Sequence, residues 1–243
     1  MDDELRTLVV ELYLYLVTCA NITLNALTDT RVIKYDRSLH AVSKAPGSKA
    51  FGVMLGCAHD LFEIIPQISR LARLRLLEQE VHHGPCKETT AVFRKLEDDI
   101  LCWKPPSSRT NQDLVLCGLI FQQGLLVYLY ASFYSRDVQN TSSQELILQS
   151  LNAAWTLLTR VDCTSPSTTI LVWPLTMLGS CAIQPRLRRK ISDTLTAMDL
   201  YLNMAPPRLA LQVLELLWDD GTLFGPLGLE EIMLKNEIVL SVA

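Results

Sequence analysis

LVLCGLIFQQGLLVYLYASFYS, residues Leu114–Ser135, is the stretch that decides the fold, because 22 consecutive residues carry no formal charge. It lies between Asp113 and Arg136. As an α-helix with a rise of about 1.5 Å per residue it would be roughly 33 Å long. A helix of that length spans either a small domain or the hydrocarbon core of a bilayer, so the class of protein depends on what surrounds it.

A second uncharged stretch, Cys163–Pro185, bears on this choice. In the first stretch, Gln122 and Gln123 fall near the middle, where their amides would need hydrogen-bond partners inside hydrocarbon. The second stretch contains serines, threonines and prolines, which suit the packed interior of a protein better. No cluster of basic residues flanks the first stretch to orient it in a bilayer. We therefore predict two helices that bury one another, and no membrane partner.

The rest of the chain shows the three- and four-residue spacing of amphipathic helices, and no strand alternation persists. The pattern predicts a first helix over residues 5–21 and a last helix over about Leu229–Val239. The predicted fold is all-α: one irregular antiparallel helical domain over residues 1–243. Its centre is formed by the buried uncharged helices 114–135 and 167–183.

The segment 51–80 is helical in pattern on both sides of Pro66. Because proline removes a backbone donor and clashes with the preceding turn, we expect either a kink or two helices that meet there. Beyond the proline, Ile68, Leu71 and Leu74 are predicted to face the core, and the neighbouring arginines to face away from it.

Composition excludes several functions. The net charge of −4 provides no electrostatic footprint for nucleic acid, so direct nucleic-acid contact by this chain is not expected. The seven cysteines are scattered without a Cys-x-x-Cys pair, which favours free thiols in a reducing compartment. The N-terminus MDDELRTLVV is acidic where a signal peptide is basic, so secretion is not expected.

We find no constellation of residues that supports catalysis. His59 and Glu63 stand four apart, as metal ligands on one helical face do, but a third ligand is not identifiable. The loop segment 82–86, HHGPC, and the acidic run 97–99 also lack the further ligands that a metal site needs. We predict no catalytic, cofactor-binding or metal-binding residues, and an enzyme is not the favoured class.

Four segments in order carry a resemblance to a known family. They are GVMLGCAHDLFEIIPQISRLARLR (52–75), GLIFQQGLLVYLYASF (118–133), LVWPLTMLGSCAIQPRLRRKI (171–191) and VLELLWDDG (213–221). The first resembles the Leu-Phe, Ile-Pro, Ile-x-x-Leu segment in the regulatory domain of fungal zinc-cluster transcription factors. The second is similar to that family's Gln-x-x-Leu-Leu-x-Tyr-Leu helix, and the third to its Trp-Pro-Leu segment. The resemblance covers most of the chain.

The resemblance implies an all-α regulatory domain that acts in the nucleus, usually C-terminal to a DNA-binding cluster in which six cysteines hold two zinc ions. Such domains modulate transcription, pair with partners and in some members bind a small apolar effector. The zinc cluster and its basic linker are absent from this sequence. The chain is therefore expected to be either a fragment of a longer factor or a stand-alone relative.

The leading hypothesis is a regulatory domain that binds a small apolar effector, or a homodimer or co-regulator partner, without contacting DNA itself. The ligand-pocket candidates are residues within the two apolar stretches: Gln122, Gln123, Tyr128, Trp173 and Met177. The two glutamines have an alternative role, which is to tie two helices together. Two other classes stay open: a biosynthetic protein that uses an apolar pocket for isomerisation or cyclisation, and a helical dimerisation scaffold.

Overall fold

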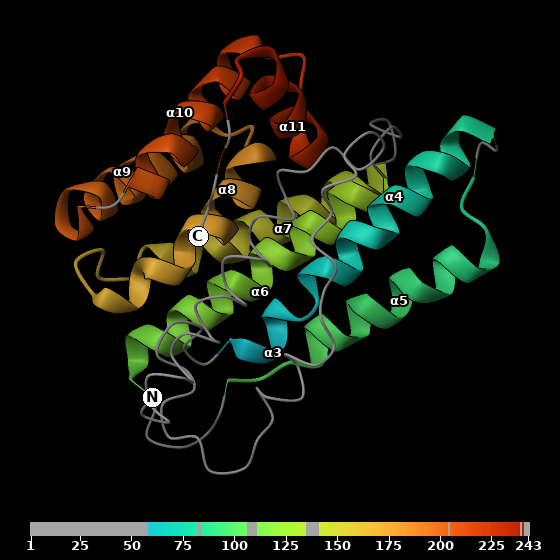
Figure 1. Ribbon diagram of the computed structural model, residues 1–243. Helices are drawn as coiled ribbons and strands as arrows, with labels where there is room; N and C mark the ends of the chain where they lie inside the picture. Colours follow the sequence, from blue (N-terminus) through green and yellow to red (C-terminus); the bar gives the residue numbers. More distant parts are fainter. Residues whose placement is uncertain are drawn as a thin grey trace, which may run out of the picture.

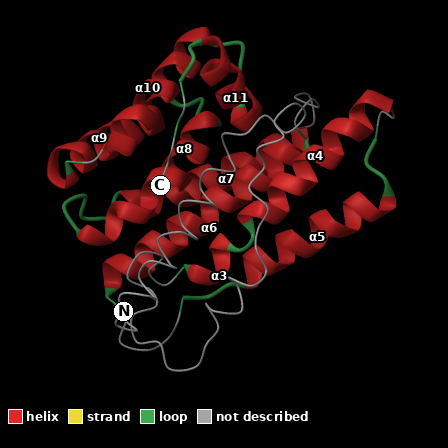
Figure 2. Ribbon diagram, viewed as in Figure 1, coloured by secondary structure: helices red, strands yellow, loops and turns green. Residues whose placement is uncertain are grey.

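The all-α prediction is confirmed in the computed structural model, which describes residues 58–81, 84–105, 111–134, 141–203, 205–238 and 240. Every regular element in these ranges is a helix (Figure 2). The helices are α3 (His59–Phe62), α4 (Ile65–Val81), α5 (Lys87–Cys102), α6 (Gln112–Phe133), α7 (Thr141–Leu158), the 3-10 helix η2 (Pro166–Leu171), α8 (Val172–Ser180), α9 (Pro185–Leu202), α10 (Ala205–Asp220) and α11 (Gly225–Lys235). The helix predicted over residues 5–21 lies outside the described residues.

Helix α6 is the centre of the fold, and it packs against α3, α4, α5, α7, η2, α8 and α11 (Figure 1). By length and composition alone it would also pass as a membrane span, but 78% of its most apolar window is buried inside the protein. Because helices cover it on several sides, it can be apolar around its whole circumference. The prediction of a buried helix over this stretch is confirmed.

The second uncharged stretch forms η2 and α8, and both pack against α6. The two uncharged segments approach closely where Gly124 of α6 faces Pro174 of α8. A Cβ atom built on Gly124 would lie 2.7 Å from the Pro174 Cβ and 2.9 Å from its Cα, closer than real Cβ contacts come. Glycine is therefore required at position 124 for this helix pair to meet.

At Pro66 the structure has two helices and not one kinked helix. Helix α3 ends at Phe62, α4 begins at Ile65, and Pro66 stands in the first turn of α4, where its missing N–H costs little. The core-facing stripe predicted for this segment is partly wrong. Leu74 is 48% exposed, whereas Arg75 is buried at 4% exposure. The arginine is buried because it has polar partners at the end of α6, described below.

The C-terminal helices form a second group. Helix α10 packs against α8, α9 and α11, and Figure 1 shows α10 and α11 at the top of the view and α9 at its left side. The predicted start of the last helix at Leu229 is wrong, because α11 already begins at Gly225. Pro226 stands in its first turn, a position that proline favours, and Gly225 has a positive φ of 71°.

Candidate functional site

A cavity of about 560 Å³ lies where the two groups of helices meet. Its wall is built from α4, the C-terminal half of α6, the start of α7, the α8–α9 corner and the α10–α11 corner. Much of the wall is aliphatic, including Ala72, Leu76, Ile147, Leu151, Leu187 and Leu217. A cavity of this size and character matches the small-molecule sites of proteins, which are mostly apolar with a few placed polar groups.

Tyr128 of α6 forms one polar part of the wall. Its ring meets the edge of Trp173 at a centroid distance of 5.7 Å, and its hydroxyl is hydrogen-bonded to Ser69 of α4. Burial raises the pKa of Tyr128 to about 12, and the Glu230 carboxylate acts in the same direction. The Ser69 hydrogen bond and Arg73 oppose that rise. The phenol is therefore neutral at physiological pH and keeps its proton as a donor.

Arg188 of α9 forms a second polar part of the wall. Its Nε donates a hydrogen bond of 2.7 Å to the carbonyl oxygen of Ala182, and its guanidinium carbon lies 5.4 Å from the centroid of the Trp218 ring. Trp218 is itself held by a 2.9 Å bond from Nε1 to the carbonyl oxygen of Gly179. Partial burial lowers the pKa of Arg188 and nearby Asp219 opposes this, but a guanidinium stays charged in proteins.

Cys181 lies in the wall at the end of α8. Burial raises the pKa of this thiol to about 12, and contact with the Ser180 hydroxyl opposes the rise only in part. A nucleophilic cysteine needs a thiolate, which a buried apolar site disfavours. Cys181 therefore acts as a small apolar wall residue.

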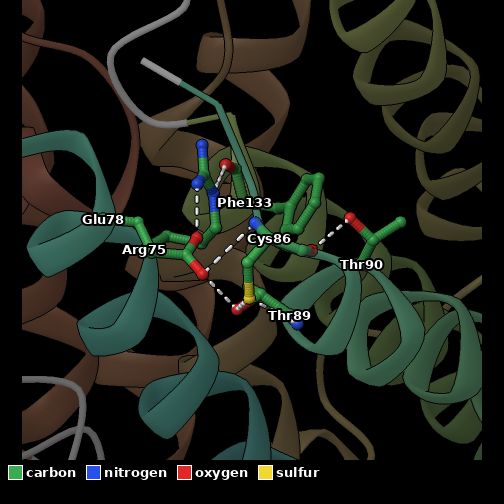
Figure 3. A network of polar contacts seen from close by, with 6 residues as sticks. All are labelled: Arg75, Glu78, Cys86, Thr89, Thr90 and Phe133. Carbon is green, nitrogen blue, oxygen red and sulfur yellow. Dashed lines mark hydrogen bonds and ion pairs between the residues drawn. The ribbon is translucent and has the colours of Figure 1, made fainter. Parts of the chain in front are cut away.

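Beside the cavity a partly buried ion pair fixes the end of α6 against α4 (Figure 3). The Arg75 Nε donates a 3.1 Å hydrogen bond to the carbonyl oxygen of Phe133, and its Nη1 lies 2.6 Å from Oε2 of Glu78. The guanidinium also stacks over the Phe133 ring, 5.1 Å from its centroid. Because the adjacent residues Leu76 and Tyr134 line the cavity, this contact holds one of its corners in place.

The other oxygen of Glu78 joins the start of α5 to the same corner (Figure 3). It accepts 3.3 Å and 2.5 Å hydrogen bonds from the Cys86 backbone N–H and the Thr89 hydroxyl. The Cys86 sulfur in turn accepts a 3.4 Å bond from the Thr89 N–H, which caps α5. Burial opposes ionisation of Glu78, but bonds from Cys86, Thr89 and Arg75 outweigh it and lower its pKa to about 2.

This lowered pKa predicts a loss of stability in acid. The folded state holds the Glu78 carboxylate with a pKa near 2, below its ordinary value of 4.5, so its stabilising effect is complete above about pH 5. The full shift corresponds to about 3 kcal/mol, and since the side chain is 19% exposed we expect about 2 kcal/mol to be lost between about pH 5 and pH 2. Urea unfolding across this range will measure the loss.

The matched variant for this prediction is Glu78→Gln, which cannot titrate. Its stability will vary less with pH than that of the wild type between pH 5 and pH 2. Equal pH dependence in the two proteins would contradict the assignment.

The structure places the five predicted pocket residues in different surroundings. Tyr128 lines the cavity, whereas Trp173 and Met177 are fully buried in the core. The Gln122 side-chain amide donates to the carbonyl oxygens of Ile100 at 2.7 Å and Trp103 at 3.2 Å, so it ties α6 to the end of α5. Gln123 is half-buried on α6. The helix-tying role expected as the alternative for the glutamines is therefore observed for Gln122.

Sequence reasoning missed the polar groups that the fold brings to this wall. Arg188, Ser69 and Glu230 come from α9, α4 and α11, and each reads locally as an ordinary surface residue of an amphipathic helix. Within the described ranges no three His, Cys, Asp or Glu side chains are grouped to hold a metal ion. The side chains of His59, His82 and His83 lie outside the described residues.

The fold and the site together define the class of this protein, which is an all-α domain with a largely apolar cavity. A model of the fungal specific transcription factor domain matches residues 2–228, and the chain belongs to this family. The resemblance found in the sequence is thereby confirmed, and the role of the chain lies in the regulation of transcription. Comparisons with curated proteins and with solved structures gave no match.

Proposed function

We propose that this domain regulates transcription in the nucleus by binding a small apolar effector in the cavity, without contacting DNA itself. The observation that carries the proposal is the cavity of about 560 Å³, whose volume falls within the range of about 300–1,000 Å³ that is usual for ligand sites. The acidic net charge of −4 supports the part of the proposal that concerns DNA, since phosphate binding depends on basic surface.

The cavity wall offers a mechanism of regulation. Its residues come from α4, α6 and α7 on one side, and from the α8–α9 and α10–α11 corners on the other. A ligand that contacts both sides stabilises the packing in which they lie together, and so shifts the population towards it. Transcription would respond if a co-regulator binds one packing better than another.

Filling the cavity tests the proposal. Ala72 lines it from α4, so Ala72→Trp places an indole in the space that the effector needs. The matched control is Leu74→Trp on the same helix, because Leu74 is 48% exposed. For wild type and control, a ligand present at about 100 times its Kd adds about 2.7 kcal/mol of stability, which raises Tm by roughly 5–10 °C for a domain of this size. Ala72→Trp should show no such shift.

The thermal-shift measurement is made with a panel of apolar molecules that differ in their polar groups, and each molecule that raises Tm is then tested in a reporter assay. In that assay the chain is fused to an unrelated DNA-binding domain. The ligand should change reporter output for wild type and Leu74→Trp, and it should leave the output of Ala72→Trp unchanged. Absence of any thermal shift across the panel would reject effector binding. A concentration-dependent dimer in light scattering, lost in Ala72→Trp, would instead assign the cavity to a second copy of the chain.

A further inference from the structure

Among the described residues that line the cavity, Arg188 alone carries a positive charge, and the structure holds it from two sides. The Nε of Arg188 donates a hydrogen bond to the Ala182 carbonyl oxygen, and its guanidinium carbon lies over the ring of Trp218, which is anchored in turn to Gly179. These contacts leave the two terminal amino groups of Arg188 without a hydrogen bond or ion pair to any part of the chain that the structure describes.

The charge of Arg188 is not neutralised by a neighbouring acid. Asp219 lies close enough to act on its pKa, but it forms no ion pair within 4.0 Å with Arg188 among the described residues. Glu230, an acidic residue of the cavity wall, lies close enough to Tyr128 to raise its pKa, and it forms no ion pair within 4.0 Å with Arg188 among the described residues. A partly buried cation without an ion-pair partner is unfavourable until an anion reaches it.

We infer that the effector is an apolar carboxylic acid, whose hydrocarbon body fills the cavity and whose carboxylate pairs with the terminal amino groups of Arg188. A guanidinium has a planar fork of donors that matches the two oxygens of a carboxylate, and such charge-assisted pairs are about twice as strong as neutral hydrogen bonds. The stacking on Trp218 fixes the fork before a ligand arrives, so little side-chain entropy is lost on binding. This inference rests on the proposed function.

Two probes of equal chain length test it, decanoate and decanol. Isothermal titration of the purified full chain at neutral pH should show decanoate binding about tenfold or more tightly than decanol, since a charge-assisted pair replaces a neutral contact. Equal binding of the two, or tighter binding of decanol, overturns the inference.

The variant Arg188→Met keeps the apolar stem and removes the charge. It should bind decanoate about tenfold more weakly and leave decanol binding unchanged. Arg189→Met is the matched control, because Arg189 is the next residue of α9 and is exposed, and it should behave as wild type. Circular dichroism checks that both variants fold, and if Arg188→Met does not, the comparison of the two probes on wild type decides alone.

The outcomes separate this inference from the proposed function. If decanol binds in the cavity and decanoate has no advantage, the domain still binds apolar molecules and only the carboxylate assignment falls. If neither probe binds and the wider panel also fails to shift Tm, both proposals fall. If decanoate binds better but equally well to Arg188→Met, its carboxylate lies elsewhere and the inference is overturned.

Discussion

Replacing Arg75 with methionine will lower the free energy of unfolding by about 3 kcal/mol, the lower end of the range for removal of one partner from a buried ion pair, because Glu78 is partly exposed. Methionine fills a similar volume but leaves the Phe133 carbonyl and one oxygen of Glu78 without their donor. Because Arg75 is 4% exposed, water cannot take its place freely. Urea unfolding monitored by circular dichroism will measure the loss. Arg70→Met, at an exposed position of the same helix, should change stability by less than about 0.5 kcal/mol.

A double-mutant cycle separates the ion pair from the other contacts of the two residues. With Glu78→Gln as the second change, the coupling energy should fall within about 0.5–3 kcal/mol, the range found for residues in one polar network. A coupling energy near zero would show that Arg75 acts only through Phe133, by its hydrogen bond and its stacking on the ring.

Replacing Trp173 with alanine will cost about 3–5 kcal/mol, because it empties the space of the largest side chain that is fully buried among the described residues. The ring is stacked on Phe121 at a centroid distance of 5.0 Å and meets Tyr128 at 5.7 Å, so both aromatic contacts are lost as well. The loss will be seen as a lower urea midpoint. Because Tyr128 lines the cavity, the substitution also removes a ring that supports the cavity wall from behind.

Trp173→Phe is the discriminating control. The indole N–H of Trp173 is buried without a hydrogen-bond partner in the described part of the protein, so phenylalanine removes an unpaired donor while it keeps an aromatic ring. Its cost should be less than half that of Trp173→Ala. A phenylalanine variant as unstable as the alanine variant would show that the indole makes a contact that ring packing does not explain.

The centre of the fold could be predicted because the signal is local. A run of 22 residues without charge, with a second uncharged stretch further along the chain, leaves two buried helices as the arrangement that satisfies both. An interruption of the helix at Pro66 was predictable for the same reason, since proline acts on the turn in which it stands, but the sequence left open whether it would be a kink or a junction of two helices. Family membership followed from the order of four such local segments.

The burial of Arg75 could not be predicted, because only one of its two partners is close to it in the sequence. Glu78 is three residues away, but the Phe133 carbonyl is 58 residues away, and only the meeting of α4 with the end of α6 brings them together. Helical periodicity assigned Leu74 to the core, since it weighs side chains by polarity. The polar residues of the cavity wall could not be predicted for the same reason, because they come from four different helices: Tyr128, Ser69, Arg188 and Glu230.

The approach of Gly124 to Pro174 limits how the domain can move. With no side chain on Gly124, α6 comes directly against the backbone and ring atoms of Pro174 in α8, and we expect this close contact to resist rotation of either helix about its axis. The two helices are therefore expected to move together as one unit. Displacements that change the cavity are expected at the α8–α9 and α10–α11 corners, where short loops join the helices of the cavity wall.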